Sequence, residues 1–561
     1  MSSHLAAATR YARQVVAGKV PACLYVRQAC HRHLDGVRRQ KQRSYPYRLD
    51  REAVEKVCQF VSLMPHVKGK WARDRLPLRL EPWQSFIVAN VFGWKRKSDG
   101  LRRYRRAYIE VPRKNGKSSF TAAIGHYMLT ADGEHGAEVY SGATTEKQAW
   151  EVFGPARLMA RGSDDYRDAF GVDVGAKNMH ILATASKFEP IIGKPGDGAS
   201  PSFSITDEYH EHATSEQYDT MVTGMGAREQ PIAWVITTAG YDTAGPCYAL
   251  RGEAVNALAG TVPADELFGL IYTIDEGDDW SDPSVLRKCN PNMGVSVFEE
   301  FLLSELKRAI ANPREQSTFK TKHENVWGGA AAPYFNLESW NRLGDPTLHW
   351  SDFRGERSII GLDLASKIDI AASTRLFRRD VAGAPHYYVF TRLYLPAARA
   401  EMAEGRHYAG WAEQGHVTTT PGDITDYDYI EADIVAAAES GPVEVASDPY
   451  NATQLLTHLQ SVLGADKVIE VPQTVSHLSE PMKELQALIV SGRIHHDGNP
   501  ALSWMIGNVT AQEDRNQNVF PRKERRENKI DGAVALIIAL GRMVHEEPAP
   551  EYAIHIIGAG V

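Results

Sequence analysis

A short segment before residue 120 combines the residue types that bind phosphate. An apolar run ends at Val111 and is followed by Pro-Arg-Lys-Asn-Gly-Lys-Ser-Ser, after which small residues predict a helix. The N-terminus of a helix offers unpaired N–H groups and a positive dipole end to an anion. Lys117 can reach the β- and γ-phosphates of ATP, and the Ser118 hydroxyl can hold Mg²⁺. The usual first glycine is replaced by Val111, so the segment predicts a variant ATP-binding loop formed by Arg113, Lys114, Asn115, Gly116, Lys117, Ser118 and Ser119.

A second apolar strand ends in two acids. Residues 202–206 lead into Asp207 and Glu208, about 90 residues after the Gly-Lys-Ser sequence. An isolated Asp-Glu pair is more often a solvated turn, but its place after a phosphate loop favours catalysis. Asp207 is placed to hold Mg²⁺, and Glu208 to orient or deprotonate the attacking water.

Further strands position these groups. Residues 137–145 and 232–240 read as buried strands with polar ends, and Thr237 and Thr238 can sense the γ-phosphate. Strands separated by helical stretches predict a parallel sheet with phosphate chemistry at its carboxyl edge. Trp83 and Gln84, at the start of the preceding helix, are candidates to stack on adenine and hydrogen-bond it.

Three acids stand out in the second half of the chain. Asp363 lies inside an apolar strand, Asp448 follows another such strand, and Asp531 lies in the first turn of an apolar helix. An acid in an apolar strand is costly unless it is paired or bound to metal. Taken singly, Asp448 could begin a turn and Asp531 could cap its helix. Together they predict a site where two divalent cations activate water and stabilise a leaving 3′-oxygen.

Other polar residues near these acids carry weaker predictions. Asp369 is a fourth candidate ligand, and Lys529 could contact the scissile phosphate or face solvent. Asp426 and Asp428 lie in a polar loop and are expected to be solvated.

The bulk composition is that of a soluble globular protein. The 561 residues are 43% hydrophobic and 24% charged, and no apolar run approaches the length of a transmembrane helix. The five cysteines are scattered without metal-site spacing and suit a reducing cytosol. Residues 1–110 hold 24 Lys and Arg against 8 Asp and Glu, or +16, so the rest carries −23. This asymmetry favours a polyanion partner.

These patterns divide the chain into successive regions. Small residues and a proline from 328 onward mark a boundary, and a second series of strands opens near 357. The expected regions are a helical basic N-terminal region (1–75), an ATPase domain (76–327), a linker (328–352), a nuclease domain (353–545) and a C-terminal tail (546–561).

The combination resembles the large terminase subunit of tailed bacteriophages. The resemblance rests on residues 111–118, Ile205-Thr-Asp-Glu, Thr237-Thr-Ala-Gly, Gly361-Leu-Asp-Leu-Ala and Lys529-Ile-Asp-Gly-Ala. The family's variant phosphate loop often lacks the first glycine and carries an arginine near its start, which Arg113 matches. The resemblance implies an α/β fold: a P-loop ATPase domain with a parallel-rich sheet, followed by a ribonuclease-H-like nuclease domain.

The resemblance also implies a function and a set of site residues. A large terminase uses ATP and Mg²⁺ to drive double-stranded DNA through a portal protein into a procapsid, and it cuts concatemeric DNA with Mg²⁺ or Mn²⁺. By analogy Glu208 is the catalytic carboxylate of the ATPase, Thr237, Thr238 and Gly240 couple hydrolysis to movement, and the nuclease metals are held by Asp363, Asp448 and Asp531. A basic finger from a neighbouring subunit is expected, with the candidates Lys187, Lys194 and Arg228.

The implied partners and location follow from the same analogy. They are a small terminase subunit, the portal and further copies of this chain in a ring, with a monomer in solution as the alternative state. The expected location is the host cell cytoplasm, transiently at the portal vertex, without a membrane.

Three alternatives remain open on the sequence. The chain could be a ribonuclease-H-like transposase, resolvase or repair nuclease with a DNA-binding N-terminal part, in which Gly116-Lys-Ser is accidental. It could be a helicase-like ATPase with an inactive C-terminal scaffold, or a capsid-associated DNA-binding protein without activity. ATP hydrolysis that is lost in Lys117→Ala would separate the motor from the first of these.

Overall fold

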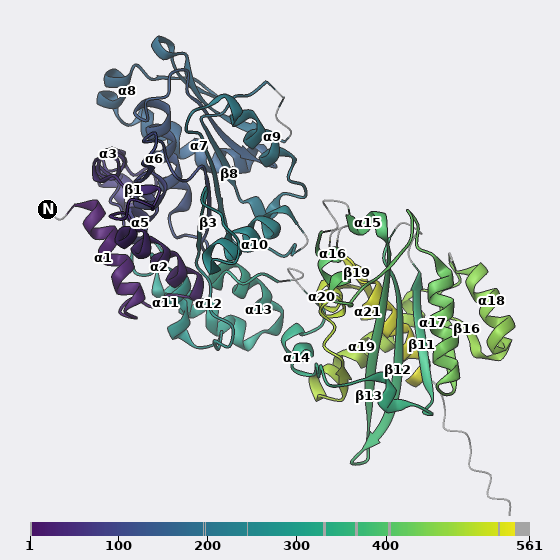
Figure 1. Cartoon of the computed structure of the whole chain (residues 1–561). Coiled ribbons are helices and arrows are strands. Elements are labelled where there is room, and N and C mark those ends of the chain that lie inside the picture. The colour runs from purple at the N-terminus through teal and green to yellow at the C-terminus, as the bar shows by residue number, and fades with distance from the viewer. Residues whose placement is uncertain are drawn as a thin grey trace, which may run out of the picture. The chain divides into compact units, whose positions relative to one another are not determined.

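The chain folds into two compact units. The first spans Met1–Ala331 and the second Ala332–Val561 (Figure 1). The computed structural model describes residues 3–193, 196, 198–243, 245–328, 333–364, 369–401, 406–450, 452–524 and 528–544.

The first unit is built on an eight-stranded sheet. Its spatial order is β10-β3-β9-β8-β4-β7-β6-β5, and the first six strands run parallel while β6 and β5 are antiparallel additions. This confirms the parallel-rich sheet and brings the carboxyl ends of β3, β8 and β9 side by side. The strands are β3 (Arg106–Glu110), β4 (Glu138–Ala143), β5 (Asp173–Val174), β6 (Met179–Ile181), β7 (Ser186–Ile192), β8 (Phe203–Asp207), β9 (Ile232–Thr237) and β10 (Leu267–Ile271).

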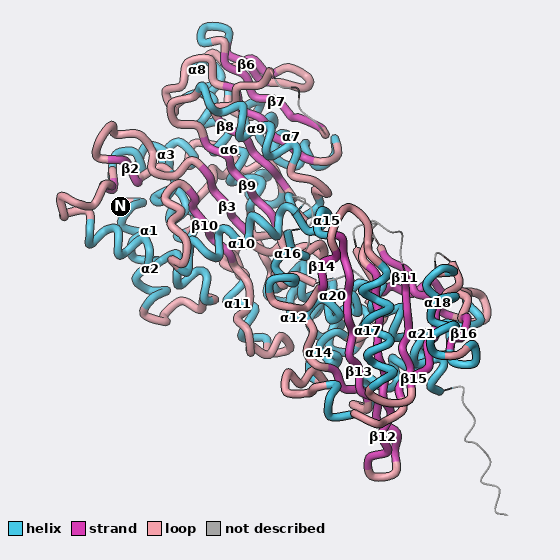
Figure 2. Tube along the Cα trace, turned by 45° about the vertical axis from the view of Figure 1, so that its right-hand side comes forward, coloured by secondary structure: helices cyan, strands magenta, loops and turns pink. Residues whose placement is uncertain are grey.

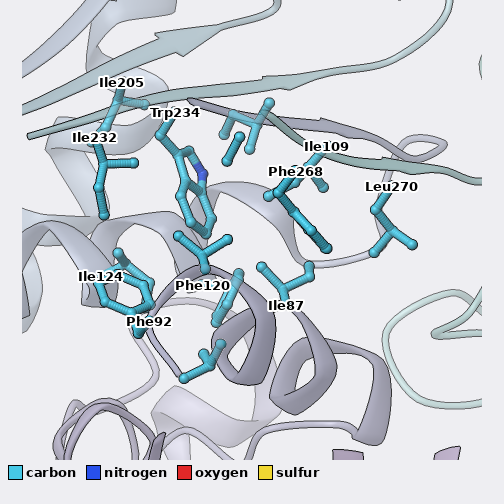
Figure 3. Packing of buried hydrophobic residues seen from close by; sticks show 14 of the residues in the cluster. Ile87, Phe92, Ile109, Phe120, Ile124, Ile205, Ile232, Trp234, Phe268 and Leu270 are labelled. Atoms are coloured by element: carbon cyan, nitrogen blue, oxygen red, sulfur yellow. The ribbon is translucent and has the colours of Figure 1, made fainter. Parts of the chain in front are cut away.

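Helices cover this sheet and bury an extensive apolar core. Side chains of β3, β8, β9 and β10 meet those of α5 and α6, with Trp234 among them (Figure 3). A short hairpin pairs β1 (Tyr47–Leu49) with β2 (Trp94–Arg96). The helices are α1 (His4–Val16), α2 (Leu24–Arg39), α3 (Arg51–Val61), α4 (Gly69–Arg73), α5 (Pro82–Val91), α6 (Lys117–Thr130), α7 (Glu146–Arg161), α8 (Asp164–Phe170), α9 (Glu216–Gly224), α10 (Pro246–Ala259), α11 (Leu286–Cys289), α12 (Glu299–Ala311) and α13 (Pro313–Phe319).

The N-terminal region is helical, as predicted, but it is not separate from the predicted ATPase domain. Buried side chains of α1, α2 and α3 belong to the same core as those of the central sheet. The Tyr11 hydroxyl lies 2.8 Å from the Tyr272 hydroxyl, just beyond β10. The predicted boundary at 75/76 therefore does not separate two compact units. The apolar faces of α1, α2 and α3 belong to the same core as the sheet and the helices that cover it.

The second unit has a mixed sheet with the ribonuclease-H-like layout. The order is β14-β13-β12-β11-β15-β16, with β17 on β13; β11, β12 and β13 are antiparallel, and β15 and β16 continue parallel to β11 (Figure 2). A separate hairpin joins β18 to β19. The strands are β11 (Ser358–Leu364), β12 (Ala371–Val381), β13 (Ala384–Pro396), β14 (Thr418–Thr420), β15 (Val443–Ser447), β16 (Val468–Glu470), β17 (Ile494–His496), β18 (Val509–Glu513) and β19 (Val519–Lys523).

One helix of the second unit lies directly against the backbone of the central strand. A Cβ atom at Gly361 of β11 would lie 2.0 Å from the Ala535 carbonyl oxygen, so only glycine allows this approach. That helix is α21, which begins at Asp531. The helices are α14 (Leu337–Arg342), α15 (Ala397–Glu401), α16 (Arg406–Glu413), α17 (Tyr427–Glu439), α18 (Thr453–Leu463), α19 (Val475–Ser491), α20 (Pro500–Asn508) and α21 (Asp531–Val544).

Most of the predicted linker 328–352 is part of the second unit, so that prediction was wrong for residues 333–352. Trp340 is fully buried, its ring stacks on His496 at 4.2 Å, and its indole N–H donates to Ser503 Oγ at 3.1 Å. Burial of the large aromatic side chains in this segment stabilises a packed structure, although the small residues and proline at its start are typical of a linker. Residues 329–332 and the predicted tail 546–561 lie outside the described residues.

Within the described part of the chain, the helices are all too short or too polar to cross a membrane.

Candidate active sites

The phosphate loop joins β3 to α6. Gly116 has φ +82°, and a Cβ there would approach Asn292 Nδ2 to 3.3 Å, so the turn requires glycine. Lys117 begins α6 and its buried ammonium donates to the Val111 carbonyl oxygen at 2.7 Å. The loop therefore curls around the Lys117 ammonium at a helix N-terminus, which is the geometry that binds phosphate. Ser118 and Ser119 occupy the first turn of α6.

Three asparagines hold the loop in shape. Asn115 Nδ2 donates to Asn290 Oδ1 at 2.9 Å, and the Asn292 backbone N–H donates to Asn115 Oδ1 at 3.0 Å. Asn115, predicted to bind ATP, thus turns its side chain into the protein, and any contact with nucleotide is left to its backbone. Arg113 and Lys114 are exposed on the same loop. No sequence pattern points to Asn290 and Asn292, which lie about 175 residues further on.

The predicted adenine contact is not formed by Trp83 in this geometry. The Trp83 ring is 2% exposed, packs edge-on against Tyr272 at 5.7 Å and donates its indole N–H to Asn292 Oδ1 at 2.7 Å. Gln84 Oε1 accepts from the Glu81 backbone N–H at 2.9 Å and completes the cap of α5. Trp83 therefore supports the phosphate loop through Asn292, whereas Gln84 stabilises the start of its own helix.

The acid pair lies where the sequence predicts it, at the carboxyl end of β8. Glu208 has φ +47°, an unfavourable conformation for a non-glycine residue that is typical of functional sites. Its backbone N–H donates to the Ile236 carbonyl oxygen at 3.0 Å and to Asp207 Oδ1 at 2.9 Å. The two neighbouring strands therefore fix the direction of the Glu208 side chain.

The two acids have opposite electrostatic environments. Burial, followed by the charge of Glu208, raises the pKa of Asp207 to about 8. Burial acts in the same direction on Glu208, but the contact with His210 and the charge of Lys117 outweigh it and lower the pKa of Glu208 to about 2. Glu208 is thus an ionised carboxylate at neutral pH, and Asp207 is a carboxyl that a cation would ionise.

The coupling segment follows β9 and lies beside the acid pair. The Thr237 hydroxyl oxygen accepts from the His210 backbone N–H at 3.2 Å and donates to the Thr238 carbonyl oxygen at 2.9 Å. On the other side, the Ala239 backbone N–H donates to Asn325 Oδ1 at 2.6 Å. His210 and Asn325 were not predicted as site residues; the first could have been noticed from its place two residues after the acid pair.

The candidate fingers are held within their own chain where the structure describes them. Arg228 donates to the carbonyl oxygens of Ser200 at 2.8 Å and Gly136 at 2.9 Å, and it pairs with Glu134 at 3.0 Å. Lys187 lies 2.9 Å from Glu189. Lys194 is outside the described residues. The internal bonds of Arg228 argue against its use as a finger for a neighbouring subunit.

The second unit brings the three predicted nuclease acids together. Leu362 of β11 pairs with Ser447 of the parallel strand β15, so the next residue on each strand, Asp363 and Asp448, lies at the same edge. The close packing of α21 on β11 adds Asp531 to this edge. Burial, then the charge of Asp531, with a further contribution from Asp448, raises the pKa of Asp363 to about 8.

Four further residues surround this cluster. Gln473 Nε2 donates to Asp363 Oδ1 at 2.8 Å, and the charge of Lys523 acts on both Asp363 and Asp531. Lys529, considered as a phosphate contact, instead pairs with Asp369 at 2.5 Å. Burial and the charge of Asp369 raise the pKa of Asp531 to about 6, which places the weaker candidate Asp369 beside the cluster. Gln473 lies in a loop, and Lys523 lies at the end of β19. No sequence pattern pointed to either residue.

The residues of this cluster fit a hard divalent cation. Carboxylate oxygens are its preferred ligands, and a cation would relieve the repulsion from Asp531 and Asp448 that contributes to the raised pKa of Asp363. As they stand, no three His, Cys, Asp or Glu side chains in the described ranges converge closely enough to enclose an ion. Ligation therefore requires small side-chain adjustments in Asp363, Asp448 and Asp531.

The metal-free nuclease site should make the protein less stable as pH rises. Folding favours the protonated form of an acid whose folded pKa is raised. The stabilisation from Asp363 is therefore complete below its ordinary pKa of 3.8 and is lost as pH rises toward 8. In EDTA, raising the pH from 6 to 8.5 should lower the melting temperature of wild type more than that of Asp363→Asn. A difference of about 2–4 °C corresponds to roughly 1 kcal/mol in a unit of this size.

Added Mg²⁺ should reverse this effect in wild type and have less effect on Asp363→Asn, because the ion binds the ionised form. The comparison between the two proteins cancels Asp207, whose raised pKa has the same sign. Equal melting shifts in the two proteins would contradict the assignment of Asp363.

Comparisons with known proteins identify the families of both domains. The family model for "Terminase large subunit, ATPase domain" matches residues 82–256, and that for "Terminase large subunit, endonuclease domain" matches 261–547. Protein YmfN of Escherichia coli (strain K12) is 48% identical over 382 residues, 66% of this chain and 83% of that protein. The large terminase subunit of Enterobacteria phage HK97 is 23% identical over 474 residues, 83% of this chain and 90% of that one. The crystal structure of the HK97 large terminase covers 87% of this chain and 99% of its own at 22% identity, with a TM-score of 0.45.

These matches decide between the alternatives. An accidental Gly116-Lys-Ser sequence is inconsistent with the ATPase match, and an inactive C-terminal scaffold is inconsistent with the endonuclease match. A DNA-binding protein without activity is inconsistent with both. The chain belongs to the terminase large subunit family and is an ATPase and endonuclease of viral DNA packaging.

Proposed function

We propose that this chain hydrolyses ATP at the carboxyl edge of its first sheet to move double-stranded DNA into a procapsid, and that it cuts the DNA with divalent cations at the Asp363 cluster. The observation that carries this proposal is the presence of two separate groups of neighbouring acids, one in each unit of a single polypeptide. Asp207 and Asp363 both have pKa values raised to about 8, and each lies at the end of a central strand.

In the ATPase unit each residue has a distinct task. Lys117 and the N-terminus of α6 bind the phosphates, and Ser118 and Asp207 hold Mg²⁺. Glu208, ionised at neutral pH, orients the attacking water and accepts its proton. Thr237 and Gly240 contact His210 beside this acid, and Ala239 in the same segment bonds to Asn325, so the segment with Thr237, Thr238 and Gly240 is placed to couple hydrolysis to movement.

In the nuclease unit the acids hold the metal ions. Asp363, Asp448 and Asp531 would bind Mg²⁺ or Mn²⁺, which supplies an activated water and neutralises the leaving oxygen. Gln473 orients Asp363 through its amide, and Lys523 provides positive charge next to the acids. The remaining chain positions the carboxylates at the edge where β11 and β15 end.

Assembly completes the motor in this proposal. The chain forms a ring on the portal in the host cytoplasm, receives DNA with a small terminase subunit, and takes its finger from a neighbouring copy. The resemblance to the family supports a neighbour's contribution, whereas the internal bonds of Arg228 and the pairing of Lys187 argue against these two residues as the finger.

The test is ATP hydrolysis by the purified monomer, measured alone and then with portal-bearing procapsids and double-stranded DNA. The monomer should be slow and the assembly faster by at least about tenfold, since a finger supplied in trans is worth roughly 10³–10⁵. A strictly monomeric sample that already turns over at the assembled rate would refute the contribution of a neighbour.

A further inference from the structure

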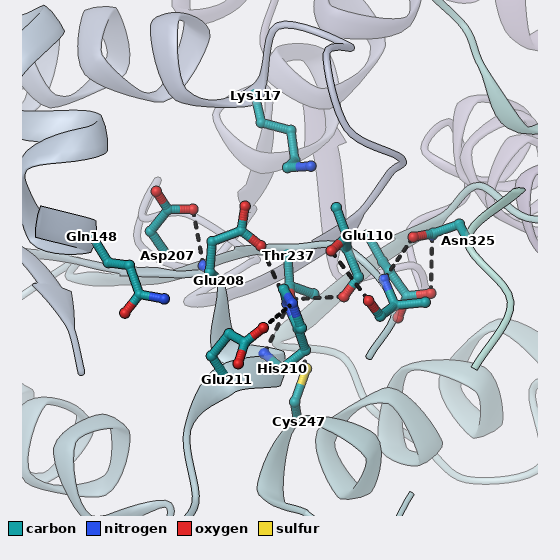
Figure 4. A network of polar contacts seen from close by, with 12 residues as sticks. Glu110, Lys117, Gln148, Asp207, Glu208, His210, Glu211, Thr237, Cys247 and Asn325 are labelled. Carbon is teal, nitrogen blue, oxygen red and sulfur yellow. Dashed lines mark hydrogen bonds and ion pairs between the residues drawn. The ribbon is translucent and has the colours of Figure 1, made fainter. Parts of the chain in front are cut away.

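A buried histidine joins the catalytic acid of the ATPase to the coupling segment. His210 lies in the short turn Tyr209–Glu211 after β8, and its side chain is 1% exposed. Its Nδ1 atom lies 3.2 Å from Glu208 Oε2 and 3.0 Å from Thr237 Oγ1. Figure 4 shows the ring between Glu208, Glu211 and Thr237.

Every polar neighbour of this ring is an acceptor. The Thr237 hydroxyl donates its proton to the Thr238 carbonyl oxygen, so it can only accept a hydrogen bond from Nδ1. Glu208 Oε2 lies 3.2 Å from Nδ1 on the same side, and Glu211 Oε1 lies 3.1 Å from Nε2 on the other, both at ion-pair distance. Nδ1 therefore donates its proton to Thr237 Oγ1, and Glu208 lies beside this hydrogen bond. A change in the position of Glu208 therefore changes the electrostatic environment of that proton.

The ring also has a steric contact with the coupling segment. A Cβ atom at Gly240 would lie 2.8 Å from the Cβ of His210, so the segment follows its path only because residue 240 has no side chain. Thr237 and Gly240 thus contact the same histidine, one through a hydrogen bond and one through packing. The segment cannot shift without moving the ring.

The other side of the segment leads to the last described residues of the first unit. Asn325 Nδ2 donates to Glu110 Oε1 at 3.1 Å, while its Oδ1 accepts from Ala239. The Gly328 backbone N–H donates to the Gly240 carbonyl oxygen at 3.2 Å. A displacement that begins at Glu208 therefore has a continuous set of contacts, from His210 through residues 237–240, to the chain that leaves this unit.

We propose that His210 is a positioning residue for ATP hydrolysis, which holds Glu208 in its water-orienting direction and transmits changes in that direction to Thr237 and Gly240. The proposal rests on the ATP site described above. It assigns His210 no contact with the reacting atoms: the ring acts through Glu208.

The test is a set of His210 variants of the full chain, assayed for ATP turnover in the assembled state. In His210→Ala, kcat should fall by about tenfold or more while KM for ATP changes by less than about twofold, since the acid loses its orientation but the phosphate loop is intact. His210→Asn places an amide N–H near the position of Nδ1 and should recover most of the turnover. His210→Gln reaches the position of Nε2 and should not.

His33→Ala is the matched control for loss of a buried imidazole. His33 is 2% exposed in the same unit and bonds to Asn90 rather than to the site. Its removal should lower the melting temperature without changing kcat. If His210→Ala does not fold, the comparison of the Asn and Gln variants decides.

Three results would overturn the proposal: wild-type turnover in His210→Ala, equal activity of the Asn and Gln variants, or a rise in KM that matches the fall in kcat. Absence of hydrolysis in wild type on assembled procapsids would instead refute the proposed function, and this inference with it.

Discussion

Asp363→Asn should abolish DNA cleavage and leave ATP hydrolysis unchanged. The substitution keeps the size of the side chain but removes the charge that, with Asp448 and Asp531, holds the metal ions. Losing an outer-shell partner of a metal costs roughly 10–100-fold in activity, and a ligand costs more. Plasmid degradation in Mg²⁺ or Mn²⁺ should therefore fall below wild type by more than about 100-fold.

The control is Asp428→Asn, which removes the same charge from an exposed residue of the same unit. It should degrade plasmid at the wild-type rate. ATP turnover of Asp363→Asn is the second readout, because the two sites belong to different compact units. Loss of nucleotide binding together with cleavage would contradict the division into two independent sites.

Glu208→Gln should stop ATP hydrolysis while ATP still binds. Glutamine keeps the shape of the side chain but cannot accept the proton of the attacking water, and losing a general base costs typically 10²–10⁴-fold. Turnover measured by phosphate release should fall by that factor, while the affinity for ATP stays within about threefold of wild type because Lys117 and the loop are unchanged.

Lys117→Ala is the companion variant, and it should lose both binding and hydrolysis because the ammonium contacts the phosphates directly. Glu229→Gln, at an exposed position in the same unit, is the neutral control. If Glu208→Gln hydrolysed ATP at the wild-type rate, the catalytic carboxylate would have to be sought elsewhere, and the role of His210 would lose its basis.

The sequence predicted those site residues that lie at the ends of central strands. Asp207, Asp363 and Asp448 each follow or interrupt an apolar run, and such a run fixes both the strand and the edge at which it ends. Parallel strands end at a common edge, so residues far apart in the chain could be placed together before any coordinates. The Gly116-Lys-Ser turn was also predictable, because a buried strand followed directly by a helix N-terminus leaves few alternative structures for the turn between them.

Residues that act from loops were not predictable in the same way. Asn292, Asn325 and Gln473 reach their partners from turns whose path depends on the whole fold. No periodicity or spacing connects Asn325 to Ala239, and the two are 86 residues apart. Such contacts are visible only once the tertiary structure fixes the loop.

Two errors have a common physical cause. Trp83 was assigned to adenine and residues 333–352 to a linker, yet both Trp83 and Trp340 are buried in cores with their indole N–H groups bonded to a side chain. Burial of a large aromatic side chain contributes so much to the free energy of folding that the composition of the surrounding sequence does not predict where the side chain lies. The basic N-terminal region is helical as predicted, but its apolar faces join the core of the first unit.

The bare backbone at Gly361 has a consequence for how this chain can change over time. Because α21 rests on main-chain atoms there, the spacing between Asp363 and Asp531 does not depend on the rotamer or size of any intervening side chain. Substitutions in the loops around the cleavage centre therefore leave the distance between these two acids unchanged. Position 361 itself is the exception, where adding a single methyl group would shift an entire helix.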